Sequence, residues 1–258
     1  DIINEPTAAT LAYAWNKGEL GNVDLPNKER TILVYDLGGG TFDVTVVRYT
    51  PTEFAVIGTD GDTMLGGLDW TDRIVNYVAE QFESKFGLDP RGDAQAHKSL
   101  MVESEAAKRE LSLWGKSTIA FEFRGQKLEH EIKREKFEEL TQDLLQRTKD
   151  TTEFTLEQTG VDPKSLDEVL LVGGSTSMPL IAEMLEACTG RKPSRELNPQ
   201  TAVAQGAAIH AAMLQSQHTG GRGQAAEPLQ RQLRSVTTKD VNSHSLGVEI
   251  RDSDDPKI

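Results

Sequence analysis

The stretch Asp36-Leu-Gly-Gly-Gly-Thr-Phe-Asp43 joins two short runs of β-prone residues, 31–35 and 43–49. Three successive glycines let backbone N–H groups approach an anion closely, and a flanking carboxylate can hold a magnesium ion through water. Thr41 can add a hydroxyl contact to a phosphate. The alternative is a flexible hairpin turn, but such a turn needs only one or two glycines and no acid at both ends. The stretch therefore predicts a phosphate-binding turn between two strands.

A second glycine turn, Val172-Gly-Gly-Ser-Thr176, follows the run Val169-Leu-Leu-Val172. That run is apolar on both faces, as a buried central strand requires. We expect the turn to open a helix, where N–H groups and the helix dipole favour an anionic ligand. Alone this turn is weak evidence, but two such turns at one sheet are much more specific. Because no Gly-x-x-x-x-Gly-Lys-Ser/Thr sequence occurs, the chain is not a P-loop protein.

Hydrophobic periodicity assigns the rest of the chain to helices and short strands. A helix over 7–15 is followed by a polar loop at 18–30, and a third strand at 54–57 completes a meander. Apolar residues recur every four positions from Ile74 to Phe86, which predicts a helix. Further elements are expected as a helix around 106–113, strands at 119–123 and 128–132, and helices at 134–158, 179–187 and 202–214.

The composition excludes several classes of protein. With 258 residues, 37% hydrophobic and 27% charged, the chain can build a globular core, and no apolar run approaches the roughly 18 residues of a membrane span. The net charge of -13 argues against nucleic acid as a partner. The single cysteine, Cys188, has no adjacent ligand or second cysteine and is interpreted as buried core in a reducing compartment. No initiator Met or signal peptide precedes Asp1, so we expect the true start upstream.

Beyond Leu214 the composition changes to Gln, Gly, Arg, Thr and Ser, and apolar periodicity disappears until Ser245-Leu-Gly-Val-Glu-Ile250. We interpret this region as a linker. The basic stretch Gly-Gly-Arg-Gly at 220–223 occurs once, without aromatic neighbours, in an acidic protein. A nucleic-acid-binding segment is therefore much less favoured than a linker.

These motifs, together with Ile3-Asn-Glu-Pro-Thr-Ala-Ala9, closely resemble the nucleotide-binding domain of the seventy-kilodalton heat-shock chaperones, the DnaK family. The resemblance covers nearly the whole chain to Leu214 and is specific to that family within the actin-like superfold. Further matching pieces are Gly61-Asp-Thr-Met-Leu-Gly-Gly67, Glu105-Ala-Ala-Lys-Arg109 with Leu111-Ser112, Lys136-Phe-Glu-Glu-Leu140, Leu170-Leu-Val-Gly-Gly-Ser-Thr176, and Asn198-Pro with Ala202-Val-Ala-Gln-Gly-Ala-Ala208.

The resemblance implies an α/β fold, the C-terminal lobe of an actin-like, ribonuclease-H-like ATPase. Residues 1–214 would form this lobe, with an inserted α+β subdomain at about 66–143. Residues 215–240 would be the linker, and 241–258 would begin the substrate-binding β domain. The first lobe, with its phosphate loop and the lysine expected to take part in hydrolysis, is absent from this chain, which would therefore hold half a cleft.

The resemblance also implies roles for individual residues. Asp36 and Glu5 would hold magnesium through water, and these two with Thr41 would be the catalytic residues. The residues that would bind ATP or ADP are Gly38, Gly39, Gly40 and Thr41 at the phosphate turn, Gly67, Glu105, Lys108, Arg109 and Ser112 in and beside the inserted subdomain, and Gly174 and Ser175 on the opposite side. Helical spacing puts most of the run 105–112 on one face, which suits a cleft wall, whereas by itself it would be interpreted as a solvated charged face.

The function implied by the resemblance is a cytoplasmic ATP-dependent chaperone that hydrolyses ATP to control the binding of unfolded polypeptide. Client polypeptides, J-domain proteins and nucleotide-exchange co-chaperones would be partners, whereas nucleic acid and membranes would not. This chain alone would be inactive, because one lobe supplies only part of the phosphate shell. The main alternative is a non-catalytic relative that acts as a holdase or exchange partner. A sugar or acetate kinase is a distant third, because it has no reason to carry Asn4-Glu5-Pro6.

The sequence departs from the family pattern at two site positions and in the linker. Ser177 stands where the family usually has an arginine that stacks on the adenine, and Gln200 stands where it usually has an aspartate. The stretch Val236-Thr-Thr-Lys-Asp-Val241 replaces a leucine-rich linker, which predicts weak docking onto the nucleotide domain. The alternative is a short apolar helix face that docks instead, formed by Leu229, Leu233 and Val236.

Overall fold

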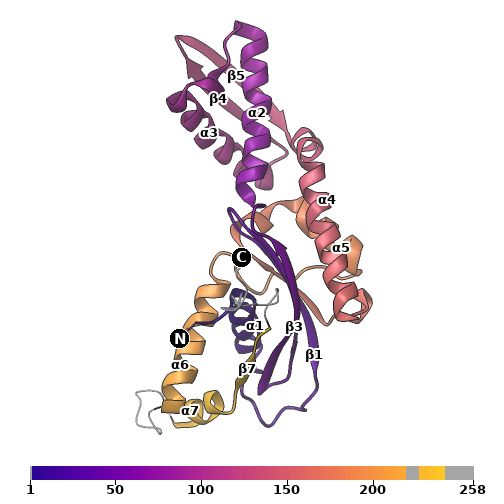
Figure 1. Cartoon of the computed structure of the whole chain (residues 1–258). Coiled ribbons are helices and arrows are strands. Elements are labelled where there is room, and N and C mark those ends of the chain that lie inside the picture. The colour runs from indigo at the N-terminus through magenta and orange to yellow at the C-terminus, as the bar shows by residue number, and fades with distance from the viewer. Residues whose placement is uncertain (1, 219–226, 242–258) are drawn as a thin grey trace, which may run out of the picture.

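The fold is a mixed α/β structure built around a five-stranded mixed sheet (Figure 1). The computed structural model describes residues 2–218 and 227–241. The strand order is β6-β1-β2-β3-β7. Strand β2 pairs antiparallel with both β1 and β3, while β6 joins β1 and β7 joins β3 in parallel. Their bounds are β1 Arg30–Leu37, β2 Phe42–Tyr49, β3 Glu53–Asp62, β6 Glu168–Val172 and β7 Thr237–Lys239.

Helices cover both faces of this sheet, because its interior strand β1 is apolar on both sides. Along β1, Leu33 and Tyr35 belong to one buried core, and Ile32 and Val34 belong to the other. Figure 1 shows α4 and α5 on one side of the sheet and α1 and α6 on the other. The bounds of these helices are α1 Glu5–Asn16, α4 Arg134–Thr159, α5 Pro179–Thr189 and α6 Ala202–His218.

A second part extends beyond one end of the sheet (Figure 1). It contains α2 (Gly67–Phe86), α3 (Ala94–Leu113) and the antiparallel pair β4 (Lys116–Phe123) and β5 (Gln126–Lys133). Every second residue of β4 is buried, as expected where one face packs on helices and the other meets water. These elements lie between β3 and the long helix α4 that returns to the sheet, within the range 66–143 where the sequence predicts an insertion.

Two of the sheet strands are longer than the sequence predicts. β3 runs to Asp62 instead of ending at residue 57, because Gly58 to Asp62 continue the pairing with β2. The stretch Thr59-Asp-Gly-Asp62 is rich in turn-forming residues, so the local sequence predicts a turn there and not a continued strand. β1 reaches Leu37 and therefore carries Asp36 within the strand.

The region interpreted as a linker is partly helix and strand. α6 continues to His218, and α7 (Glu227–Arg234) precedes β7. Leu233 and Val236 are buried in the same core as α1, and Leu229 packs against it. β7 pairs its backbone with Glu53–Ala55, so its polar side chains do not prevent docking. The prediction of weak docking therefore differs from the structure, which has the alternative apolar helix face. Residues 219–226 and 242–258, including the expected start of a substrate-binding domain, lie outside the described residues.

Two further expectations concern Cys188 and membranes. Cys188 is half-buried at the edge of the core rather than fully buried, with its thiol 3.7 Å from Glu153 Oε1 and 3.7 Å from Met184 Sδ. Of the helices within residues 2–218 and 227–241, none combines the length and the apolar character needed to cross a membrane.

Candidate functional site

The glycine turn between β1 and β2 is the point where three elements meet. The Gly38 N–H donates to the Thr41 carbonyl at 3.0 Å, which closes the turn. The Gly38 carbonyl accepts hydrogen bonds from the Gly67 N–H and from Ser175 Oγ, both at 2.9 Å. Because Gly67 begins α2 and Ser175 follows β6, one carbonyl ties the turn to both neighbouring elements.

The exposed side of this turn is open, while its other side is tightly packed. Cβ atoms added at Gly39 or Gly40 would meet nothing within 4 Å. A Cβ at Gly66, in contrast, would lie 2.5 Å from the Gly40 nitrogen and Cα, so only glycine lets the start of α2 approach the turn this closely. Exposed peptide groups held on a rigid support are suited to binding an anion.

Three carboxylates gather beside the turn. Asp36 on β1 is paired in register with Asp43 on β2, and Glu5 lies in the first turn of α1. Asp36 is only 8% exposed. Burial, with the charges of Glu5 and Asp43, raises the pKa of Asp36 from 3.8 to about 7. Burial, with the charges of Glu5 and Asp60, also raises the pKa of Asp43.

Gly173 brings the second glycine turn against this cluster. Its φ of +85° is in the left-handed region, and an added Cβ would clash with the Leu37 carbonyl and lie 2.9 Å from Asp36 Oδ1. Glycine is therefore required for the end of β6 to approach the end of β1.

The carboxylate cluster fits a magnesium ion held through water. Within the described part of the chain, no three His, Cys, Asp or Glu side chains are arranged to hold a metal ion directly. Magnesium, however, keeps several water ligands and is commonly held by one or two carboxylates plus substrate phosphates. A buried carboxylate, Asp36, that is repelled by the nearby charges of Glu5 and Asp43 is an arrangement that a divalent cation stabilises. Asp36 and Glu5 thus have the donor chemistry for the ion, beside the open face of the glycine turn.

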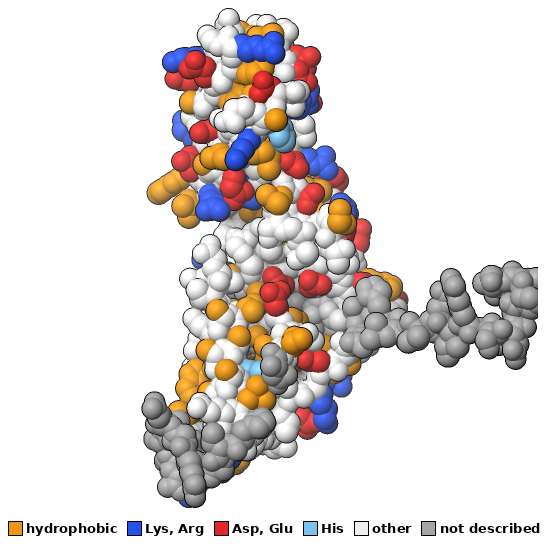
Figure 2. All heavy atoms as spheres, turned by 60° about the vertical axis from the view of Figure 1, so that its left-hand side comes forward, with side chains coloured by type: hydrophobic (Ala, Val, Ile, Leu, Met, Phe, Trp, Pro, Cys, Tyr) orange, Lys and Arg blue, Asp and Glu red, His pale blue; other side chains and the backbone are white. Residues whose placement is uncertain are grey.

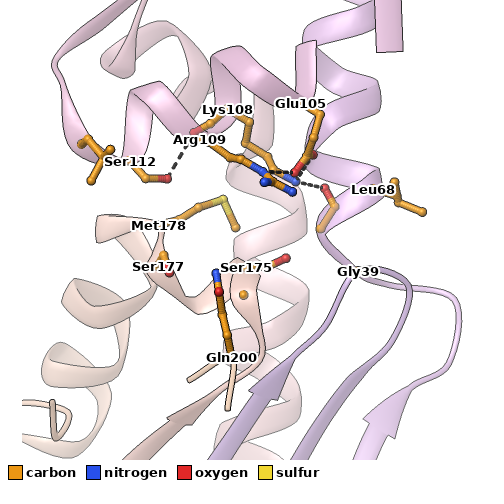
Figure 3. Close-up of a pocket in the computed structure, with 13 residues that line it drawn as sticks. Gly39, Leu68, Glu105, Lys108, Arg109, Ser112, Ser175, Ser177, Met178 and Gln200 are labelled. Carbon is orange, nitrogen blue, oxygen red and sulfur yellow. Dashed lines mark hydrogen bonds and ion pairs between the residues drawn. The ribbon is translucent and has the colours of Figure 1, made fainter. Parts of the chain in front are cut away.

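A pocket of about 660 Å³ opens next to the turn (Figure 3). One wall comes from α3 and the start of α2, and the other from the segment that follows β6. Its lining residues are Gly39, Gly67, Leu68, Glu105, Lys108, Arg109, Ser112, Leu113, Gly174, Ser175, Ser177, Met178 and Gln200. A volume of this size accommodates a nucleotide-sized ligand.

The α3 wall is held in place by the buried ammonium of Lys108. Its Nζ donates to the Gly67 carbonyl at 2.6 Å and to Thr71 Oγ1 at 2.9 Å, and it lies 2.7 Å from Glu105 Oε2. Because three acceptors surround it, Lys108 fixes α3 against the start of α2 and orients Glu105. Ser112 Oγ donates to the Lys108 carbonyl at 3.1 Å (Figure 3).

The charges on this wall compensate one another. Burial lowers the pKa of Lys108, although Glu105 opposes the change. Burial alone would raise the pKa of Glu105, but hydrogen bonds from Lys108, Thr71 and Arg109 hold it below its ordinary value. Glu105 is therefore an ionised acceptor at neutral pH. Arg109 is largely exposed and directs its Nε to Glu105 Oε1 at 2.9 Å.

The opposite wall is a short 3-10 helix, η3 (Gly174–Ser177). The glycine turn after β6 leads into this 3-10 helix, and α5 begins at Pro179, as the sequence predicts, with Met178 as its N-cap. The physical reason is that Pro179 is favoured in the first turn of α5 and disfavours the α-conformation at the residue before it. The start of α5 is thus separated from Gly174 and Ser175 by the rest of η3 and by Met178.

Comparisons with known proteins identify the family of this chain. The family model described as "Hsp70 protein" matches residues 1–255. The "Chaperone protein DnaK" of Thermus thermophilus is 41% identical over 97% of this chain, and that of Mesomycoplasma hyopneumoniae is 42% identical over 96%. The corresponding protein of Halobacterium salinarum is 37% identical over 97% of the chain. The chain belongs to the Hsp70 family.

The match covers a limited part of each relative. The chain spans 38% of the length of the Thermus and Mesomycoplasma proteins and 37% of the Halobacterium protein. The activity, substrates and partners of a whole Hsp70 protein are therefore not assigned to this chain by the match.

The Hsp70 chain brings most of its predicted site residues together. The pocket is lined by eight of them: Gly39, Gly67, Glu105, Lys108, Arg109, Ser112, Gly174 and Ser175. The other five lie at or beside the glycine turn and outside the pocket lining: Glu5, Asp36, Gly38, Gly40 and Thr41. The two departures from the family pattern, Ser177 and Gln200, both line the pocket. The predicted roles of all these residues stay predictions.

Four residues of the site were not singled out from the sequence. Thr71 links Lys108 to Glu105, but nothing in its sequence neighbourhood marks it. Leu68, Leu113 and Met178 line the pocket, and the first two are more than half exposed. Figure 2 shows hydrophobic side chains at the surface of the upper part, among charged ones. The position of Leu68 directly after the glycine motif at 66–67 is the sequence signal that could have indicated its place in the site.

Proposed function

We propose that this chain forms the adenine-nucleotide-binding part of an ATP-dependent chaperone whose complete form hydrolyses ATP to control the binding of unfolded polypeptide. The observation that carries the proposal is the pocket between α3 and η3, which ends at an open glycine turn beside the buried carboxylate of Asp36. In this proposal the chain is the C-terminal lobe of an actin-like ATPase, and its clients and co-chaperones are those expected of the family.

The nucleotide would lie with its phosphates at the glycine turn and its base between α3 and η3. Gly39, Gly40 and Thr41 would hold the phosphates through exposed peptide groups and a hydroxyl. Glu105 would accept a ribose or base hydrogen bond, because its pKa keeps it ionised and Lys108 holds its orientation. Magnesium would neutralise the β- and γ-phosphate oxygens when bound, and Asp36 and Glu5 would hold its water ligands.

A calorimetric titration of the intact protein with ADP tests the binding site. Arg109→Ala removes an exposed side chain that lines the pocket, so folding is little affected, and we expect ADP affinity to fall about tenfold. Lys98→Ala is the matched control, since Lys98 is an exposed cation on the same helix outside the pocket. An equal effect of the two substitutions would contradict the site.

A non-catalytic holdase or exchange partner is the second candidate, and the pocket positions of Ser177 and Gln200 favour it. Both lie on the η3 side of the pocket, and Gln200 brings a neutral amide where the family usually has a carboxylate. Single-turnover hydrolysis of labelled ATP separates the two candidates. Tight ATP binding without turnover in the intact protein would support the holdase, whereas magnesium-dependent turnover would support the ATPase.

A further inference from the structure

A second pocket, of about 560 Å³, borders the proposed nucleotide pocket. The two pockets share four lining residues: Ser112, Leu113, Ser177 and Met178. Because the same side chains line both, these four residues form the boundary between two neighbouring cavities. Beyond the boundary, the second pocket extends under the start of α5 and the loop that precedes α6.

The boundary lies at the end of the nucleotide pocket away from the glycine turn. Figure 3 shows Ser112, Ser177 and Met178 on one side and Gly39 and Leu68 on the other. If phosphates occupy the turn, the base of the nucleotide points toward the boundary. The exocyclic amine of adenine, N6, is on the purine edge away from the ribose, so it is the group that faces the second pocket.

The interior of the second pocket is suited to an uncharged apolar group. Its apolar lining beyond the boundary includes Leu171, Pro179, Ala182, Pro193, Leu197 and Pro199. Two acidic residues, Glu183 and Glu186, and two basic residues, Lys192 and Arg195, also line it. Since their formal charges balance, the pocket gives no net electrostatic preference for an anion or a cation. Apolar contact is therefore the main source of affinity that this pocket offers.

Ser177 leaves the boundary open. Met178 is buried, whereas Ser177 is exposed and carries a small side chain between the two pockets. A long side chain at this position would project across the passage from the η3 wall. We propose that this protein accepts adenine nucleotides with an aryl or alkyl substituent on N6, that the second pocket holds the substituent, and that Ser177 determines this specificity. This inference rests on the proposed nucleotide site.

Calorimetric titration of the intact protein with ADP and with N6-benzyl-ADP tests the inference. We expect N6-benzyl-ADP to bind about tenfold more tightly than ADP, because the phenyl ring is removed from water in the second pocket. Ala182→Trp fills that pocket without touching the nucleotide pocket, and it removes the preference while ADP affinity stays unchanged. Ala187→Trp is the matched control, at an exposed position on the same helix outside both pockets, and it changes neither affinity.

A second variant is expected to change the affinities for ADP and for N6-benzyl-ADP in opposite directions. Ser177→Arg closes the passage, so the preference for N6-benzyl-ADP is lost even where ADP itself binds more tightly. If Ala182→Trp does not fold, the comparison of wild type with Ser177→Arg tests the inference by itself. The inference is overturned if the wild type binds ADP but binds N6-benzyl-ADP no more tightly than ADP, or if the preference survives Ser177→Arg. If neither nucleotide binds the wild type, the proposed nucleotide site itself fails and this inference fails with it.

Discussion

Asp36 and Asp43 face each other as a register pair on the antiparallel strands β1 and β2, with the glycine turn between them. Burial raises the pKa of both carboxyls, and the charge of Glu5 from α1 raises both further. Like charges placed directly opposite on a sheet are destabilising, so this pair costs folding free energy when no cation is bound. The fold thus holds a carboxylate cluster whose charge a bound magnesium ion would compensate.

The first prediction concerns pH and stability. Asp36 has a folded-state pKa of about 7, above its ordinary 3.8, so between these values the folded state binds more protons than the unfolded state. Stability contributed by this group is therefore present at low pH and is lost as pH rises toward 7. We expect Asp36→Asn to be more stable than wild type at pH 8, by up to about 4 kcal/mol, and close to wild type at pH 4.

Urea unfolding at pH 4 and pH 8, without magnesium, measures this difference. Asp24→Asn is the control, because Asp24 is exposed in a loop away from the cluster. Adding magnesium at pH 8 should raise the stability of the wild type more than that of Asp36→Asn. Equal stability of Asp36→Asn and wild type at pH 8 would contradict the buried-charge assignment.

The second prediction concerns catalysis in the intact protein. Asp36→Asn should reduce ATP hydrolysis by a factor of 100 or more, on the order of 3 kcal/mol, while ADP affinity changes much less. The physical reason is that the carboxylate positions magnesium, whereas the phosphates remain held by peptide groups of the glycine turn. Single-turnover rates and calorimetric affinities check the split. Equal losses in both quantities would remove Asp36 from its proposed role.

The third prediction concerns Ser177. This residue is exposed on the η3 wall of the pocket, where a longer side chain can reach the base. Ser177→Arg should tighten ADP binding by on the order of 1 kcal/mol, because a guanidinium can stack on the adenine ring. Ser177→Gln is a control with a polar but shorter side chain that lacks the charge and the guanidinium fork. Calorimetry that finds no gain for the arginine variant would mean that Ser177 does not face the base.

The fourth prediction concerns the close approach of Gly173 to β1. Gly173→Ala should destabilise the protein by about 3 kcal/mol, because its φ of +85° strains a side chain and the new Cβ meets the Leu37 carbonyl. Gly18→Ala is the matched control, with a φ of +68° but open space around the added atom. Gly18→Ala should lower the free energy of unfolding by only about 1 kcal/mol. If thermal or urea unfolding gives equal losses for the two variants, the close approach carries no cost.

The fifth prediction concerns the docked segment of α7 and β7. Leu233 is 3% exposed in the core that contains α1, so Leu233→Asp should detach this segment, at a local cost of 3 kcal/mol or more. Hydrogen exchange of the β7 amides should accelerate by a factor of 100 or more. Thr237→Asp, at an exposed position on β7, is the control and should leave exchange within a few-fold of wild type. Protection that persists in Leu233→Asp would show that backbone pairing alone holds the strand.

Local sequence determined the elements that surround the site. The three glycines at 38–40, the β-prone runs beside them and the apolar strand Val169–Val172 each follow from residue type and short spacing, so these elements were predicted close to their observed positions. The apolar spacing of Leu229, Leu233 and Val236 likewise indicated a docking face, although the polar residues beside it suggested the opposite.

Tertiary structure decided how these elements meet, because contacts between residues far apart in the chain depend on strand register and helix packing. The extension of β3 to Asp62 required the pairing partner on β2, since its own residues favour a turn. The enclosure of Lys108 by Gly67, Thr71 and Glu105 required α2 to pack against α3. The raised pKa of Asp36 required a register that sets it opposite Asp43 and a helix that brings Glu5 close, and burial between sheet and helices gives those charges their effect.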